Sequence, residues 1–120
     1  MKQISKRKRQ AEMQEATEIR LCEPAPFIYF ENGQIAVTDG SSVWLVIVTC
    51  EAMKATASPP EKSLRRLVRY AEFYRDLAAA NIRRGEDLDG KVWVRESDVL
   101  AAKSSLGLDR EHRSHLRERV

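Results

Sequence analysis

The stretch VWLVIV, residues 43–48, is apolar at every position. A strand with one face in water alternates apolar and polar side chains, whereas a strand flanked on both sides is a continuous apolar run. Six residues are also far fewer than the roughly 20 that a membrane-spanning helix needs. The stretch therefore predicts an interior strand, and we expect it to form the centre of a sheet.

Two β-prone segments precede this strand and predict a hairpin. Residues 27–30 (FIYF) and 35–38 (IAVT) flank a segment that contains Asn32-Gly33. Asn-Gly favours a two-residue hairpin turn because both positions tolerate positive φ. A second turn at residues 39–42 (DGSS) leads into the central strand, and residues 92–94 (VWV) predict a later, short strand.

A long amphipathic helix is predicted after the central strand. Ser58, Pro59 and Glu61 fit a capping box with proline at the first helical position, where no amide hydrogen is needed. Apolar residues then recur at spacings of three and four until Gly85, a typical C-terminal stop. This pattern predicts about seven turns of helix packed on the sheet.

These elements predict an α+β domain. We expect a small antiparallel sheet, made of a three-stranded meander plus one later strand, packed against one long amphipathic helix with short flanking helices. The 120 residues suit one domain. Residues 1–26 are predicted to be a basic N-terminal arm, partly helical or disordered, residues 27–106 the single α+β domain, and residues 107–120 a charged C-terminal helical tail.

The net charge of +3 lies at the two ends of the chain. Residues 1–20 hold six basic and three acidic side chains, whereas residues 27–100 hold ten basic and eleven acidic ones. A cluster of Lys6, Arg7, Lys8 and Arg9 precedes every acidic residue. Such a cluster attracts phosphate through counterion release, and it also occurs as a simple solubilising arm. These four residues are the candidate nucleic-acid contacts.

Three larger side chains, Tyr70, Phe73 and Leu77, lie on a stripe beside the main apolar face of the predicted long helix. One interpretation is that the helix is deeply packed and touches two elements. The other is that the stripe binds a protein partner or a second copy of the chain. We take these three residues as the candidate partner-binding site.

No segment carries a catalytic, cofactor or metal signature. The two cysteines, Cys22 and Cys50, are too far apart for a zinc knuckle or a redox pair, and they are expected to be reduced thiols in the cytoplasm. His112 and His115 have helical spacing, but a metal site needs further ligands. Trp44 and Trp93, on predicted strands, are expected to fill the core. We therefore expect no catalytic residue, no metal and no cofactor.

Three segments resemble a family of short uncharacterised bacterial proteins, a domain-of-unknown-function family. The segments are residues 48–53 (VTCEAM), residues 77–85 (LAAANIRRG) and residues 91–94 (KVWV) with Asp98. The likeness covers roughly residues 27–100. It implies a small α+β fold and a bacterial origin, but no established activity and no residue roles.

The functional prediction is a cytoplasmic, non-enzymatic protein-interaction or accessory module, with self-association as one form of that role. The alternative is a nucleic-acid-binding protein that uses its basic terminal arms. The expected partner is a protein or a second copy of the chain, with nucleic acid at the arms as the alternative and no membrane contact.

Overall fold

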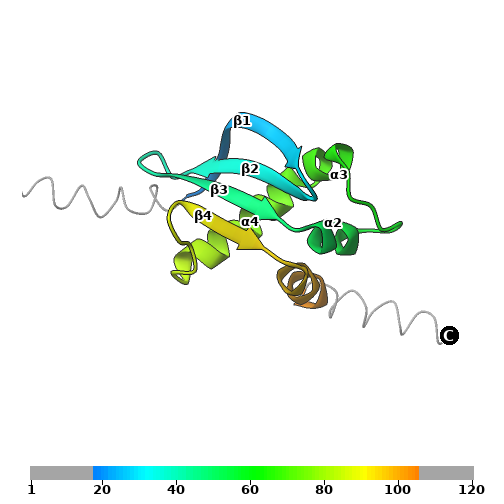
Figure 1. Cartoon of the computed structure of the whole chain (residues 1–120). Helices are drawn as coiled ribbons and strands as arrows, with labels where there is room; N and C mark the ends of the chain where they lie inside the picture. Colours follow the sequence, from blue (N-terminus) through cyan, green and yellow to red (C-terminus); the bar gives the residue numbers. More distant parts are fainter. Residues whose placement is uncertain (1–17, 106–120) are drawn as a thin grey trace, which may run out of the picture.

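The computed structural model describes residues 18–105, which form one four-stranded sheet with helices packed against it (Figure 1). The strands are β1 (Arg20–Tyr29), β2 (Asn32–Thr38), β3 (Val43–Val48) and β4 (Lys91–Val94). The helices are α2 (Cys50–Thr56), α3 (Leu64–Arg69), α4 (Ala71–Arg83) and a further helix from residue 96 to residue 105. No helix among these described residues has the length and apolar character needed to cross a bilayer.

The sheet is mixed, with the order β1-β2-β3-β4. β1, β2 and β3 pair antiparallel, whereas β4 pairs parallel with β3. The prediction of an antiparallel sheet is therefore wrong at its last strand. Parallel pairing requires a long crossover, and residues 49–90 supply it by carrying three helices between the end of β3 and the start of β4.

The core lies between one face of the sheet and the helices, and we call this side of the sheet the helix face. Its strand residues are Leu21, Ile28, Ile35, Val37, Trp44, Val46, Val48, Val92 and Val94. They pack with buried residues of all four helices, which are Ala52, Met53, Leu67, Tyr74, Ala78 and Val99. In Figure 1, α4 crosses behind the strands. One continuous core thus joins every described helix to the same face of the sheet.

The first strand begins at Arg20, seven residues before the predicted start at Phe27. Arg20 pairs with Thr38 and Cys22 with Ala36, and an irregularity then separates Cys22 from Phe27 in the register with β2. Part of the predicted arm is therefore strand. Residues 1–17 of that arm, including Lys6, Arg7, Lys8 and Arg9, and the whole of the predicted tail lie outside the described residues.

The β1–β2 turn lies at Phe30-Glu31 rather than at Asn32-Gly33, because Tyr29 pairs with Asn32. The Asn-Gly prediction is thus shifted by two residues. Asn32 and Gly33 are instead the first two residues of β2, where each makes a specific contact with a helix.

The Asn32 side chain accepts a hydrogen bond from the Cys50 backbone N–H at 3.0 Å, where α2 begins. Gly33 lies directly under Leu67 of α3, and a Cβ atom at this position would stand 2.7 Å from Leu67 Cδ1. A glycine is therefore required by the close approach of the helix to the strand.

Gly33→Ala is expected to lower the free energy of unfolding by about 1–3 kcal/mol, because Leu67 is fully buried and cannot swing aside. Leu67→Ala opens the space that the new methyl group needs. The double variant should therefore lose less stability than the sum of the two single variants. Urea denaturation of the three variants measures this coupling, and strictly additive losses would contradict the packing described here.

The predicted long helix is divided into α3 and α4 at Tyr70, whose φ of −107° and ψ of 20° are not helical. The helix also starts later than predicted, because Ser63 rather than Ser58 is its N-cap. The Ser63 side chain accepts a hydrogen bond from the Arg66 N–H at 3.1 Å. Residues 57–62 form the loop before it.

Candidate interaction surface

The face of the sheet opposite the helices, which we call the open face, carries the alternate strand residues. Its members are Arg20, Cys22, Phe27, Tyr29, Asn32, Gln34, Ala36, Thr38, Val43, Leu45, Ile47, Lys91 and Trp93. Not one of these residues belongs to the cluster that packs with the helices. The described part of the chain therefore covers one face of its sheet and leaves the other uncovered.

The open face is apolar where a solvated sheet face would be polar. β3 contributes Val43, Leu45 and Ile47 to this side, so it is apolar on both faces. The exposed side chains include Phe27 and Trp93, and 39% of Trp93 is accessible. The prediction that Trp93 fills the core is wrong, since its place in the register puts it on the open face.

The register arranges the open face in rows that run across the strands. One row consists of Phe27, Gln34, Ile47 and Trp93, and the next consists of Cys22, Ala36, Leu45 and Lys91. Ile47 is only 7% exposed, because it lies between its two cross-strand neighbours. Large aromatic side chains thus stand on the outer strands, above a flatter aliphatic centre.

The charges on this face have one sign. Arg20 and Lys91 are its charged strand residues, and none of its positions is acidic. Arg95 follows β4 and places its guanidinium 5.3 Å from the centre of the Trp93 ring, a cation–π contact. The strand residues of this face are thus aromatic, aliphatic or cationic, while three acidic side chains line the pocket at the β4 edge beside them, namely Glu86, Asp89 and Asp98.

The hairpin tip extends the aromatic surface. Phe30 is 81% exposed, and its ring centre lies 4.5 Å from that of Tyr29. Its φ of 59° is in the left-handed region, where a bulky side chain is strained and glycine is preferred. Residues held in such conformations cluster at functional sites. The tip is therefore part of the candidate surface.

The sequence-predicted stripe of Tyr70, Phe73 and Leu77 is half-buried and packs against the core. The guanidinium groups of Arg66 and Arg69 lie 5.7 and 5.9 Å from the Tyr70 ring centre. Partner binding by this stripe stays a prediction, and the open face offers more uncovered apolar surface. The signal for that surface was present in the continuous apolar run of residues 43–48.

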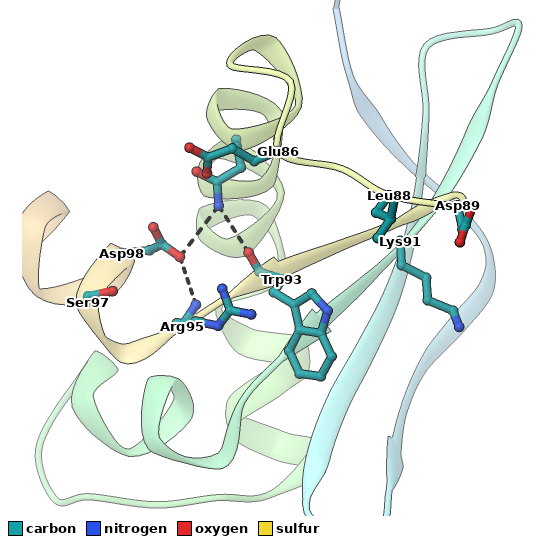
Figure 2. A pocket seen from close by; sticks show the side chains of 9 residues that line it. Glu86, Leu88, Asp89, Lys91, Trp93, Arg95, Ser97 and Asp98 are labelled. Atoms are coloured by element: carbon teal, nitrogen blue, oxygen red, sulfur yellow. Dashed lines mark hydrogen bonds between the residues drawn. The ribbon is translucent and has the colours of Figure 1, made fainter.

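A pocket of about 640 Å³ lies along the outer edge of β4 (Figure 2). It is lined by Asn81, Glu86, Leu88, Asp89, Lys91, Trp93, Arg95, Ser97 and Asp98. Histidine and cysteine are absent from this lining, so it offers no nucleophile with an imidazole base. The described residues also contain no group of three or more side chains that could hold a metal ion.

A hydrogen-bond network joins Asn81 to Asp98 and to the backbone of Trp93 and Arg95 in this pocket. The Asn81 side chain donates to the Trp93 carbonyl oxygen at 3.0 Å and to Asp98 Oδ2 at 3.5 Å, and Asp98 Oδ2 also accepts from the Arg95 N–H at 2.8 Å (Figure 2). Arg84 donates to Asn81 Oδ1. Asn81 is almost fully buried. The network therefore ties α4 to β4 and to the start of the last helix.

Comparison of the chain with family models, with curated proteins and with solved structures finds no match.

Proposed function

We propose that this chain is a cytoplasmic, non-enzymatic protein-interaction module that docks its partner on the open face of the sheet. The observation that carries the proposal is the pattern of β3, which is apolar on both faces while the described helices cover only one. A strand of this composition is found where both faces are covered. A partner that covers the second face completes that arrangement.

The side chains of the open face are the types that dominate binding energy at protein interfaces. Tyrosine, tryptophan and arginine are enriched among such residues. Trp93 and Arg95 are in contact at the β4 edge of the face, and Tyr29 lies on β1 at the opposite edge, toward the same end of the strands. Covering apolar surface contributes roughly 25 cal/mol per Å² before the entropic cost of association. Trp93 is therefore the best single probe of the surface.

Trp93→Thr is expected to abolish partner binding or to weaken it at least 10-fold, since threonine keeps the strand propensity but removes the indole ring. Leu100→Gln is the matched control, because Leu100 is 49% exposed on the last helix, which packs into the core on the helix face through Val99. Light scattering after size-exclusion chromatography measures self-association. Capture with wild-type and variant baits measures binding to other proteins.

The proposal requires that the complex survives in Leu100→Gln and is lost in Trp93→Thr. Equal binding by both variants, with both folded by circular dichroism, would place the partner elsewhere. The proposal would be refuted if the wild-type chain is a monomer and captures no protein that the Trp93→Thr variant fails to capture.

Nucleic-acid binding is the second candidate, favoured by the cations and the absence of carboxylates among the paired strand residues of the open face. Single-stranded nucleic acid binds where aromatic rings stack on bases and cations follow the phosphates. The basic cluster of Lys6, Arg7, Lys8 and Arg9 belongs to the segment that leads into β1. Contact between this cluster and nucleic acid stays a prediction.

A further inference from the structure

We infer that the partner on the open face is a second copy of this chain, packed sheet against sheet about a two-fold axis that runs along the strands. This arrangement places β1 of each copy over β4 of the other. The inference rests on the proposed function, because it names the occupant of the surface proposed there.

Both edges of the sheet carry features that disfavour its extension by a second copy. Pro24 and Pro26 lie within β1 and have no N–H group to donate. At the other edge, the N–H and C=O groups of Lys91 bond to Leu88, and the carbonyl oxygen of Trp93 accepts from Asn81. Association through backbone pairing is thereby disfavoured, and the uncovered face remains.

A symmetric interface must be complementary to itself. A two-fold axis along the strands places the second sheet over the first with its strand order reversed. Each row then lies over the same row of the second copy, because positions along the strands do not change. The row through Phe27 and Trp93 therefore faces itself, with Phe27 over Trp93 of the second copy. One step toward the tip, Tyr29 faces Arg95 of the second copy, which is a favourable cation–π pairing. By the same symmetry, Gln34 on β2 faces Ile47 on β3 of the second copy.

A second symmetric arrangement has its axis across the strands. It places each strand over its own copy in the opposite direction, so that Tyr29 faces Arg20 of the second copy. The aromatic residues of one chain then lie over the small and cationic half of the other. Residues that dominate binding tend to pair with such residues on the partner. The concentration of Phe27, Tyr29 and Trp93 at one end therefore favours the axis along the strands.

The size of the face sets the expected strength of the dimer. Four strands about 4.8 Å apart and roughly 20 Å long give a flat footprint of about 400 Å² per copy. Stable interfaces commonly cover about 800 Å² per partner, and smaller ones belong to weak, reversible complexes. The aromatic side chains of the hairpin tip enlarge the contact. We therefore expect a reversible dimer that forms at micromolar concentrations.

Cysteine cross-linking tests this arrangement in a background with Cys22→Ser and Cys50→Ser. Three variants are prepared from it, with Tyr29→Cys, Arg95→Cys or Arg20→Cys. Each is treated with a short bis-maleimide alone and in equimolar pairs. Non-reducing electrophoresis and mass spectrometry then quantify the covalent dimer.

The expected result is that the mixture of Tyr29→Cys and Arg95→Cys gives at least 5-fold more covalent dimer than either variant alone. The two Tyr29 positions lie over opposite edges of the sheet, too far apart for a short linker. The inference is overturned if Tyr29→Cys pairs best with Arg20→Cys, which indicates the axis across the strands, or if no pair cross-links.

Light scattering of the wild-type chain at rising concentration separates this inference from the proposed function. A dimer that is sensitive to Trp93→Thr but has another cross-linking pattern overturns only the arrangement. A monomer that captures a different protein in a Trp93-dependent manner overturns the second copy as partner but keeps the docking surface. A monomer whose open face binds a single-stranded oligonucleotide, and no protein, overturns both.

Discussion

Replacing Arg66 with methionine is expected to lower the free energy of unfolding by about 3–5 kcal/mol. The Arg66 side chain is 7% exposed and donates hydrogen bonds to three backbone carbonyl oxygens. They belong to Met53 at 3.0 Å, Ala57 at 3.1 Å and Pro59 at 2.9 Å. Methionine fills much of the same volume but leaves these acceptors without their donor. The end of α2 and the loop before α3 would then lose their common support.

Arg65→Met is the control for that prediction. Arg65 is the adjacent arginine, its side chain is 81% exposed, and it forms an ion pair with Glu61 at 3.1 Å. Exposed ion pairs of this kind contribute roughly 0–1 kcal/mol. Urea denaturation followed by circular dichroism should therefore show a large loss for Arg66→Met and a small one for Arg65→Met. Equal losses would mean that Arg66 acts as a surface charge rather than as a clamp on the loop.

Tyr74→Ala is expected to cost about 3–5 kcal/mol, because Tyr74 is the largest fully buried side chain of the core. Tyr74→Phe removes only the hydroxyl group, which forms a hydrogen bond of 2.7 Å with the Thr56 hydroxyl. Its expected cost is about 1–2 kcal/mol. The difference between the two variants in urea denaturation measures the contribution of the ring, and similar losses would contradict the packing.

Tyr74 also links stability to alkaline pH. Burial raises the pKa of Tyr74 above its ordinary value of 10.0, although its hydrogen bond with the Thr56 hydroxyl opposes this shift. The folded chain therefore keeps a proton that the unfolded chain has lost once the pH exceeds about 10, so stability falls as the pH rises further. Tyr74→Phe should lose less stability than the wild type between pH 9 and pH 11. Parallel losses would exclude Tyr74 as the source.

The sequence correctly predicted those elements whose structure is determined by a local hydrophobic pattern. The apolar run at residues 43–48 identified β3 as an interior strand, and the residues around it identified an α+β fold with a late strand at residues 92–94, which begins one residue earlier in the structure. Hydrophobic periodicity is a local property and can be recognised without knowing the tertiary contacts. It cannot show whether two strands run parallel, because that depends on the path of the crossover.

The wrong predictions of turns and helix starts concern residues whose role depends on tertiary contacts rather than on the local sequence. Asn32 and Gly33 predict a turn, but they are needed to bond the start of α2 and to admit Leu67. Ser58 and Pro59 predict a helix start, but the loop that contains them is held by Arg66. The uncovered face of the sheet was not predicted, although the apolar run at residues 43–48 implies that both faces of this strand are covered. Which face the helices leave uncovered depends on the tertiary packing, and the candidate partner-binding residues were predicted on the helix instead.

The parallel pairing of β3 with β4 also sets the order in which the chain can complete its fold during synthesis. β1 and β2 are made before β3, but residues 49–90 must follow before β4 can cover the remaining edge of β3. Until then, a nascent chain presents a strand that is apolar on both faces and has free backbone groups along one edge. Such edges template aggregation. A chain that stops before residue 91 is therefore expected to need chaperone protection that the finished fold no longer requires.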